Sequence, residues 1–257
     1  MIRRLELFGL DFQAGLSVEE ISDDVMNRSE CDPGRIPLLI TPNVDQIVKL
    51  SRRDQLSLKQ ELSKSQWILP DGQPIIAVSK IKYGKAGLPA RLTGSDFFPV
   101  VWKRILNTNA RVLFIVPQLI LGEKFKEEHS SSLFYSPPYF DLNDNEQVQT
   151  ILREIKELCS REAFDFVFIG LGFPKQEILA FSIFEHLTEH NKPFPKIFLL
   201  GASFEFYFGL KKRAPVFWQK LGIEFVHRLL TEPKRMAKRY LVDDVAFLRI
   251  AWNELRK

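Results

Sequence analysis

Polar side chains stand directly after several apolar runs of this 257-residue sequence. The run PLLIT (37–41) is followed by Asn43, the run WIL (67–69) by Asp71, and the run DFVFIG (165–170) by LGFPKQ (171–176). If these runs are parallel strands, their carboxyl ends meet at one edge of a sheet, where ligands bind in open α/β folds. The candidate binding residues at this edge are Thr41, Asn43, Asp71, Gly172, Lys175 and Gln176.

Asp71 is the candidate whose chemistry is easiest to define. It lies in LPDGQPII (69–76), between two apolar runs. Pro-Asp-Gly is a common turn sequence, so the aspartate could serve the turn alone. A carboxylate at a pocket rim could instead act as a general base, if it lies within hydrogen-bond reach of a substrate hydroxyl. The residues alone leave both interpretations open.

The segment GLGFPK (170–175) has part of the spacing of a dinucleotide-binding loop. Lys175 stands where the third glycine of that motif belongs, and no clear acidic strand end follows about 20 residues later, so a nicotinamide enzyme is disfavoured. The segment is either an ordinary β–α turn or a turn whose backbone N–H groups hold an anion at a helix N-terminus.

Metal ligands are not grouped in a recognisable pattern. His186 and His190 are four residues apart, but HLTEH lacks the glutamate placement of the HExxH zinc motif, which favours a solvated helix face. The chain also has no Asp-x-Asp, a common way to hold a metal against a sugar nucleotide. We therefore predict no metal and no cofactor, and a transferase built on this chain would need protein cations instead.

The C-terminal part of the chain supplies such cations. Residues 211–257 carry 12 basic and 5 acidic side chains, a net charge of +7, whereas residues 1–210 carry a net charge of −3. Aromatic residues alternate with the basic ones, which suits a membrane-surface helix or a lid that binds a diphosphate. A solvated helix face and a nucleic-acid surface are the alternatives, and the sequence contains no recognisable nucleic-acid-binding motif.

Continuous apolar runs alternate with helical patterns along the first 210 residues. Strands are predicted at 37–41, 111–116, 165–172 and 196–201, and helices at 44–62, 148–159 and 175–187, with Asn143 or Asn145 capping the second. This alternation predicts an α/β fold with a Rossmann-like parallel sheet sandwiched by helices. From Pro215 onward the pattern is helical, so we predict a core domain over 1–210 and a basic helical appendage over 211–257.

Two observations bear on the cellular compartment. No signal peptide and no membrane-spanning stretch is predicted, because the longest apolar windows fall far short of about 20 residues. Cys31 and Cys159 are too far apart in sequence to indicate a disulfide framework. The expected location is the cytoplasm.

Five segments match one family in content and in order. They are TPNVDQIV (41–48), LPDGQPII (69–76), LPARLTGSDFFP (88–99), FVFIGLGFPKQE (166–177) and GLKKRAPVFWQKLGIEFVHRLLTEPKRMAKRYL (209–241). Read together, they resemble the WecG/TagA/CpsF glycosyltransferases of bacterial surface polysaccharide synthesis. Two departures are Pro70, where the family usually has alanine, and FIVPQLILGEKF (114–125), where it usually has a Gly-rich stretch.

The resemblance implies a metal-independent, inverting transfer of a sugar from a UDP-sugar to a sugar carried on undecaprenyl diphosphate. UDP-glucose, UDP-N-acetylmannosamine and UDP-N-acetylmannosaminuronate are the donor candidates. By position, the family's base falls on Asp71, its polar pocket residues on Thr41 and Asn43, and its PKQE glutamine on Gln176. The arginines expected to meet the diphosphates are Arg213, Arg228, Arg235 and Arg239.

These expectations place the protein peripherally on the inner face of the plasma membrane. Its expected partners are the UDP-sugar donor, the prenyl-diphosphate-linked acceptor and an anionic membrane surface, with no nucleic acid. The sequence leaves open whether the protein forms a homo-oligomer. The alternative function is a non-catalytic module of the same fold that binds a nucleotide sugar or a membrane surface.

Overall fold

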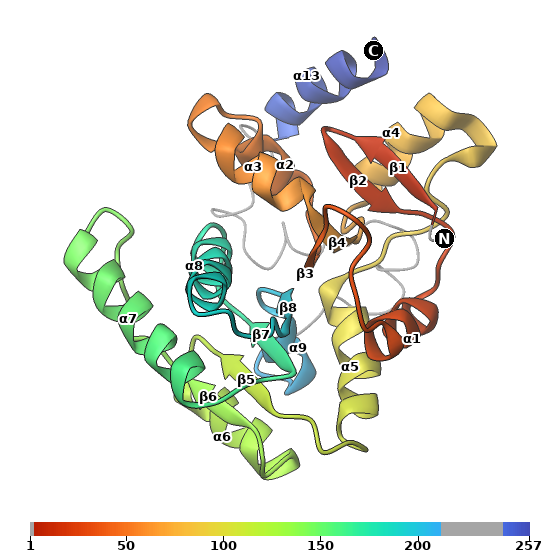
Figure 1. Ribbon diagram of the computed structural model, residues 1–257. Helices are drawn as coiled ribbons and strands as arrows, with labels where there is room; N and C mark the ends of the chain where they lie inside the picture. The colour runs from red at the N-terminus through yellow and green to blue at the C-terminus, as the bar shows by residue number, and fades with distance from the viewer. Residues whose placement is uncertain (1–2, 212–243) are drawn as a thin grey trace. The chain divides into compact units, whose positions relative to one another are not determined.

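The computed structural model describes residues 3–211 and 244–257 (Figure 1). Their contacts divide the chain into two compact units. The first unit draws on Met1–Ser17, Thr41–Thr93 and Lys211–Lys257, and the second on Val18–Ile40 and Gly94–Leu210. Among the described residues, no helix is both long enough and apolar enough to cross a membrane.

The second unit is built on a parallel sheet. Its strands are β3 (Ile36–Ile40), β5 (Val112–Ile115), β6 (Leu133–Tyr135), β7 (Phe166–Ile169) and β8 (Lys196–Leu199). They lie side by side in the order β3-β8-β7-β5-β6, and each neighbouring pair is parallel. The central strands β5 and β7 are buried along their whole length, which explains their unbroken apolar sequence. The parallel α/β fold predicted from the sequence is confirmed.

Three phenylalanines form a ladder across the middle of this sheet. Phe114 on β5 is in register with Phe168 on β7, which is in register with Phe198 on β8. The ring centroids are 5.2 Å and 4.6 Å apart, and both pairs are stacked. Because the rings lie at equivalent positions of neighbouring strands, they point to the same face of the sheet.

Helices cover both faces of the sheet. On the ladder face, α5 (Gly94–Ile105) packs with α1 (Val18–Asn27) and α9 (Ser203–Tyr207). The Phe98 ring of α5 lies 5.5 Å from Phe168 and 4.9 Å from Phe204 of α9. Helix α6 (Leu119–Glu128) lies along β6 on the same face, because its Phe125 ring stacks on Phe114 with 3.8 Å between ring centroids. On the other face, α7 (Asn145–Arg161) packs against α8 (Lys175–Glu189) (Figure 1).

The first unit combines a hairpin with short helices. The hairpin strands are β1 (Arg4–Leu7) and β2 (Leu10–Gln13), and β2 packs beside β4 (Ser65–Ile68). The remaining elements are α2 (Val44–Leu50), η1 (Arg53–Gln55), α3 (Leu56–Ser63), α4 (Gln73–Tyr83), η2 (Gly84–Ala86) and α13 (Asp244–Leu255).

The C-terminal helix α13 is held in the first unit by packing and by charge. It packs against α2 and α4, and Phe247 meets Phe8 of the hairpin turn with 5.6 Å between ring centroids. The buried Glu254 carboxylate accepts hydrogen bonds from Lys82 at 2.5 Å and from Lys257 at 3.0 Å. Burial by itself raises the pKa of Glu254, but these two ammonium groups outweigh burial and hold the pKa below its ordinary value.

Two local predictions were wrong. The helix expected over 44–62 is divided, because Arg52 is extended with a ψ of 147° and the Ser51 hydroxyl donates to the Ile47 carbonyl. The cap of α7 is neither Asn143 nor Asn145 but Asp144, whose side chain accepts from the Gln147 N–H at 3.1 Å. Most of the predicted appendage lies outside the described residues, so the boundary at residue 210 stays a prediction.

Gly122 of α6 provides a test of the packing between α6 and β6. A Cβ at this position would lie 2.1 Å from the Phe134 ring. Overpacking of this kind costs about 1–3 kcal/mol, more than the roughly 1 kcal/mol that alanine gains over glycine in a helix. We expect Gly122→Ala to lower the free energy of unfolding measured in urea.

Glu123→Ala, at the exposed neighbouring position of α6, is the matched control and should change the free energy of unfolding by at most about 0.5 kcal/mol. A more stable Gly122→Ala protein would show that α6 does not pack on β6 as described.

Candidate functional site

Three loops of the first unit are joined by backbone hydrogen bonds beside Asp71. The Asp71 N–H donates to the Pro42 carbonyl at 3.1 Å, which ties the loop after β4 to the segment between Thr41 and Asn43. The Leu92 N–H donates to the Pro70 carbonyl at 2.9 Å. Thr41 and Asn43 precede Asp71 by 30 and 28 residues in sequence, and all three therefore belong to one loop cluster of half-buried residues.

Asn43 has a structural role in this cluster. Its side-chain oxygen accepts from the Gln46 N–H at 3.1 Å, and the Gln46 side chain accepts from the Asn43 N–H at 3.1 Å. This reciprocal pair is a capping box at the start of α2. The amide Nδ2 group, which the cap does not use, is the donor that Asn43 could offer to a ligand.

The segment 88–93 lies beside Asp71, although its sequence pattern indicates no site residue. The Leu92 bond to Pro70 brings this segment beside Asp71, and Arg91 is the cation next to it in sequence. The sequence does not predict that Arg91 lies near Asp71, because no local pattern indicates that residues 70 and 92 are hydrogen-bonded.

In the second unit, the turn from β7 into α8 contains the remaining described candidates. Gly170 is buried, and a Cβ there would lie 2.4 Å from the Phe204 ring, so this glycine is required by packing. At Gly172, by contrast, a Cβ would meet nothing within 4 Å, and the residue is exposed. The backbone at Gly172 is thus open to a ligand, whereas Gly170 belongs to the core.

Gln176 joins the two loops that follow β7 and β8. It is only 3% exposed, and its Oε1 accepts from the Gly201 N–H at 3.2 Å. Its Nε2 donates to the Glu177 carboxylate at 3.0 Å. These contacts fasten the start of α8 to the β8–α9 turn, a role that the sequence pattern does not reveal.

Lys175 is directed toward the loop that follows β6. Its ammonium group donates to the Phe140 carbonyl at 2.5 Å and lies 4.1 Å from the centroid of the Phe140 ring. Within the second unit, the structure thus joins the loops after β6, β7 and β8 through Lys175 and Gln176. The four candidate arginines, Arg213, Arg228, Arg235 and Arg239, lie outside the described residues.

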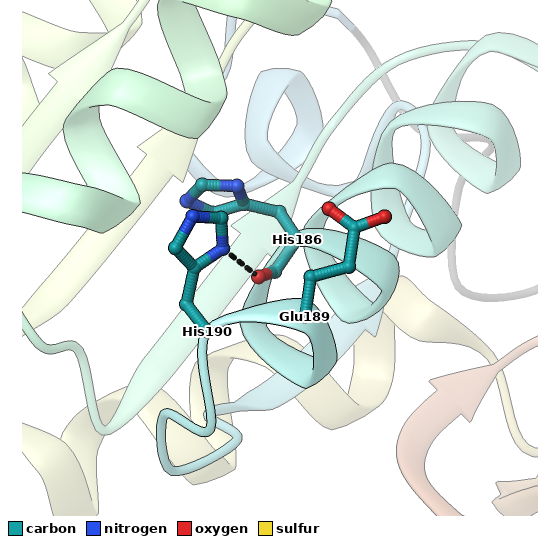
Figure 2. A group of neighbouring side chains, drawn as sticks. All are labelled: His186, Glu189 and His190. Carbon is teal, nitrogen blue, oxygen red and sulfur yellow. Dashed lines mark hydrogen bonds between the residues drawn. The ribbon is translucent and has the colours of Figure 1, made fainter.

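The solvated helix face that the sequence predicted for the histidine pair on α8 is right for His190, which is exposed, and wrong for His186, which is buried. His186 is 8% exposed, because α7 packs over it, and its Nε2 lies 2.7 Å from the Ser160 hydroxyl. His190 Nδ1 lies 2.8 Å from the His186 carbonyl (Figure 2). Burial, and then the nearby His190, lower the pKa of His186, so its ring stays neutral near pH 7.

His186, Glu189 and His190 are the group of possible metal ligands found among the described residues, with ligand atoms within 4.8 Å of one another. Hydrogen bonds already engage one nitrogen of each ring. The group also lies at the end of α8 opposite Lys175, about 20 Å away along the helix axis. His186 therefore belongs to the α7–α8 packing, and the group lies away from the candidate residues.

Two cavities of the second unit lie away from the candidate residues. One, of about 300 Å³, is lined by Cys159, Leu187 and Lys192 among others. The other, of about 780 Å³, includes Arg28 and Lys196 in its lining. Arg28 is paired with Asp24 and Asp32, and Lys196 donates to the Val25 carbonyl, so both cations serve local structure.

A parallel sheet with polar loops after its strands defines an α/β ligand-binding protein of the Rossmann-like class. Comparison with known families is more specific, since the family described as "Glycosyl transferase WecG/TagA/CpsF family" matches residues 5–257. The chain belongs to this glycosyltransferase family, which confirms the resemblance seen in the sequence.

Residues 114–125, which depart from the family pattern, contain the stacked pair Phe114 and Phe125, with ring centroids 3.8 Å apart.

Two relatives carry the same name, N-acetylglucosaminyldiphosphoundecaprenol N-acetyl-beta-D-mannosaminyltransferase. The protein from Bacillus spizizenii is 32% identical over 180 residues, which are 68% of this chain and 64% of the relative. The protein from Staphylococcus aureus (strain NCTC 8325 / PS 47) is 26% identical over 249 residues, which are 91% of this chain and 87% of the relative. The chain thus spans just under two thirds of the first relative.

The contacts of Gln176 generate a prediction about stability. Gln176→Leu keeps the side chain buried but leaves the half-buried Gly201 N–H without its acceptor and removes the Gln176 donor from the buried Glu177 carboxylate. A buried polar group that loses its hydrogen-bond partner costs about 1–3 kcal/mol. We expect the variant to unfold at lower urea concentration, with a free energy of unfolding reduced by about that amount.

Gln147→Leu on α7 is the control, because the Gln147 side chain is exposed and makes its bonds within its own loop and helix turn. If Gln176→Leu were as stable as the wild type, the link between the two loops would have no structural role.

Proposed function

We propose that this protein is an inverting glycosyltransferase that moves a sugar from a UDP-sugar to a sugar carried on undecaprenyl diphosphate. The observation that carries the proposal is the family match over residues 5–257, which includes the Asp71 loop and the PKQE turn. The names of the two relatives support N-acetylmannosamine as the transferred sugar and N-acetylglucosamine on the lipid diphosphate as the acceptor.

In this proposal Asp71 is the general base. Its carboxylate accepts the proton of an acceptor hydroxyl as that oxygen forms a bond to the anomeric carbon of the donor. The bond from the anomeric carbon to UDP breaks, and UDP departs with the electron pair on the face opposite the attack. The configuration at the anomeric carbon is therefore inverted. General bases of this kind contribute about 10²–10⁴-fold in rate.

The negative charge that develops on UDP needs a counter-charge. We assign this role to protein cations and not to a metal, since the sequence contains no Asp-x-Asp and has clustered basic residues after residue 210. Lys175, at the start of α8, is the described cation nearest in sequence to the open backbone at Gly172. Arg213, Arg228, Arg235 and Arg239 are the further candidates.

A transferase assay tests the proposal. The full chain is incubated with N-acetylglucosaminyl diphosphoundecaprenol and each of UDP-N-acetylmannosamine, UDP-glucose and UDP-N-acetylmannosaminuronate. We expect turnover with the first donor that persists in excess EDTA. Asp71→Asn should lower kcat at least about 10²-fold, while UDP binding and the unfolding midpoint stay nearly unchanged.

Asp54→Asn is the matched control, because Asp54 is an exposed carboxylate of the same unit. Near-wild-type kcat in Asp71→Asn would remove Asp71 from the mechanism, and activity that EDTA abolishes and Mg²⁺ restores would refute metal independence. UDP binding without turnover of any donor would favour the alternative, a non-catalytic binding module.

We also propose that the protein docks on an anionic membrane surface through α13. The helix buries Phe247 and Ala251, whereas Val245, Leu248 and Trp252 are exposed large apolar side chains. With 3.6 residues per turn, these three lie on the opposite face of the helix, and the exposed Arg249 lies beside them. Apolar and aromatic side chains flanked by cations suit insertion at the level of lipid headgroups.

Sedimentation with vesicles tests this docking. Each basic residue near an anionic bilayer contributes about 1 kcal/mol and is screened by salt, whereas apolar insertion is not. We expect reversible binding to anionic vesicles that salt weakens but does not abolish, and a double variant Leu248→Ser with Trp252→Ser that loses the salt-resistant part.

Surface substitution is preferable to truncation here, because α13 packs on α2 and α4. Leu119→Ser, an equally exposed apolar position of the second unit, is the control. If the double variant sediments with vesicles as the wild type does at all salt concentrations, α13 is not the docking helix.

A further inference from the structure

The C-terminal end of α8 brings three possible metal ligands together. His186, Glu189 and His190 each offer one ligand atom, and these atoms lie within 4.8 Å of one another. Figure 2 shows the two imidazole rings side by side, and their centroids are 4.3 Å apart. Packing against α7 accounts for the buried His186 ring, but it does not account for the exposed His190 ring beside it.

Hydrogen bonds decide which nitrogen of His186 is available to a ligand. The Ser160 hydroxyl donates its single hydrogen to the Lys156 carbonyl at 2.8 Å. The same hydroxyl must therefore accept in its 2.7 Å contact with His186, so the hydrogen of this contact is on Nε2. A neutral imidazole with its hydrogen on Nε2 has its lone pair on Nδ1.

The tautomer of His190 is fixed in the same way. Its Nδ1 lies 2.8 Å from the His186 carbonyl, and because a carbonyl only accepts, Nδ1 carries the hydrogen and Nε2 the lone pair. Histidines that bind metals ordinarily donate their second ring N–H to a carbonyl, a carboxylate or a water, which orients the ring. His190 has this arrangement directly, and His186 has it through the Ser160 hydroxyl.

The backbone that carries His190 is also fixed. Asn191, the next residue, has a φ of 50°, and its N–H donates to the Thr188 carbonyl at 3.2 Å. The Lys192 N–H donates to the Leu187 carbonyl at 2.9 Å. This pair of bonds is a Schellman motif, which closes the helix. The carbonyl end of a helix carries partial negative charge, which favours a bound cation.

We propose that His186, Glu189 and His190 bind one divalent transition-metal ion of the class of Zn²⁺. Two imidazole nitrogens and one carboxylate oxygen suit Zn²⁺, whereas Mg²⁺ and Ca²⁺ prefer oxygen ligands alone. Within the described part of the chain, the Glu189 carboxylate makes no hydrogen bond and no ion pair, so it is available as the anionic ligand.

Only a small adjustment would complete the coordination. Zinc–nitrogen bonds of about 2.0–2.1 Å in a tetrahedral site place two ligand atoms about 3.3 Å apart. The ligand atoms, now within 4.8 Å of one another, would therefore close by at most about 1.5 Å. Glu189 and His190 are exposed and can make this movement, while Ser160 holds the buried His186 ring in place.

A metal at this site would have a structural role. The site is at the opposite end of α8 from Lys175, about 20 Å away along the helix axis, so the ion would take no part in the proposed sugar transfer. The glutamate that HLTEH lacks is the general base of HExxH enzymes. Its absence argues against that hydrolytic chemistry but leaves the binding of an ion possible. The ion would hold the end of α8 in its observed conformation.

Calorimetric titration of the full chain tests the inference. The protein is freed of metal with EDTA, dialysed and titrated with Zn²⁺ alone. We expect one Zn²⁺ per chain, much weaker binding of Mg²⁺, and a thermal unfolding midpoint that rises with Zn²⁺, because an ion that binds only the folded state stabilises it.

Substitutions at the exposed positions should weaken Zn²⁺ binding without loss of the fold. Loss of a group that orients a ligand costs about 10–100-fold in metal affinity, which is the effect expected for Ser160→Ala. Loss of a ligand itself should cost at least as much, so we expect a decrease of about 10²-fold or more in His190→Gln. Glu189→Gln should also bind Zn²⁺ more weakly than the wild type does.

Three control variants should bind Zn²⁺ as the wild type does. Glu185→Gln changes an exposed carboxylate of the same helix that lies outside the group. His129→Gln and His227→Gln change the two other histidines of the chain, of which His227 lies outside the described residues.

Electron paramagnetic resonance with Cu²⁺ as the probe reports the ligands directly. The spectrum should show coupling to two imidazole nitrogens in the wild type and to one in His190→Gln. Unchanged Zn²⁺ affinity in His190→Gln, loss of binding in a control variant, or equal affinity for Mg²⁺ would each overturn the site. These outcomes do not touch the proposed function, which is tested by turnover of a UDP-sugar.

Discussion

The stack of Phe114, Phe168 and Phe198 is the interaction on which the second unit depends. Because the three rings occupy registered positions, they set the relative heights of β5, β7 and β8. The helices on that face then dock on the same rings, with Trp102 of α5 lying 5.1 Å from Phe114. The carboxyl ends of β7 and β8 are level as a result, so Gln176 can reach Gly201 with a single hydrogen bond.

In each unit, the candidate polar residues are held by the protein before any ligand arrives. In the first unit Asn43 caps α2. In the second, Gln176 fastens two loops, and Lys175 contacts the Phe140 carbonyl and the rings of Tyr139 and Phe140. Groups restrained in this way lose little freedom when a ligand binds, which is the advantage of preorganisation. The proposed transfer, in which protein cations stabilise the departing UDP, would depend on such restraint, because flexible side chains cannot stabilise a developing charge at low cost.

Several features were hidden from sequence analysis for identifiable reasons. Helix α5 contains Pro99 in its interior, where a proline usually ends a helix, and its buried aromatic contacts maintain it nonetheless. His186 looked like a surface residue because i, i+4 spacing does not reveal that α7 covers it. The hydrogen bond between Leu92 and Pro70 joins residues far apart in sequence, so no local sequence pattern could predict it.

The sequence by itself determined the parallel α/β class, the family, and which loops carry polar residues, because apolar runs, helical periodicity and motif order are local properties of the chain. Tertiary structure alone decided what those residues contact. The glycines of GLGFPK look alike in sequence, yet the Phe204 ring fills the space beside Gly170 and leaves Gly172 open. Tyr139 and Phe140 are neighbours in the chain, and only the position of Lys175 and the packing of the loop bury one and expose the other.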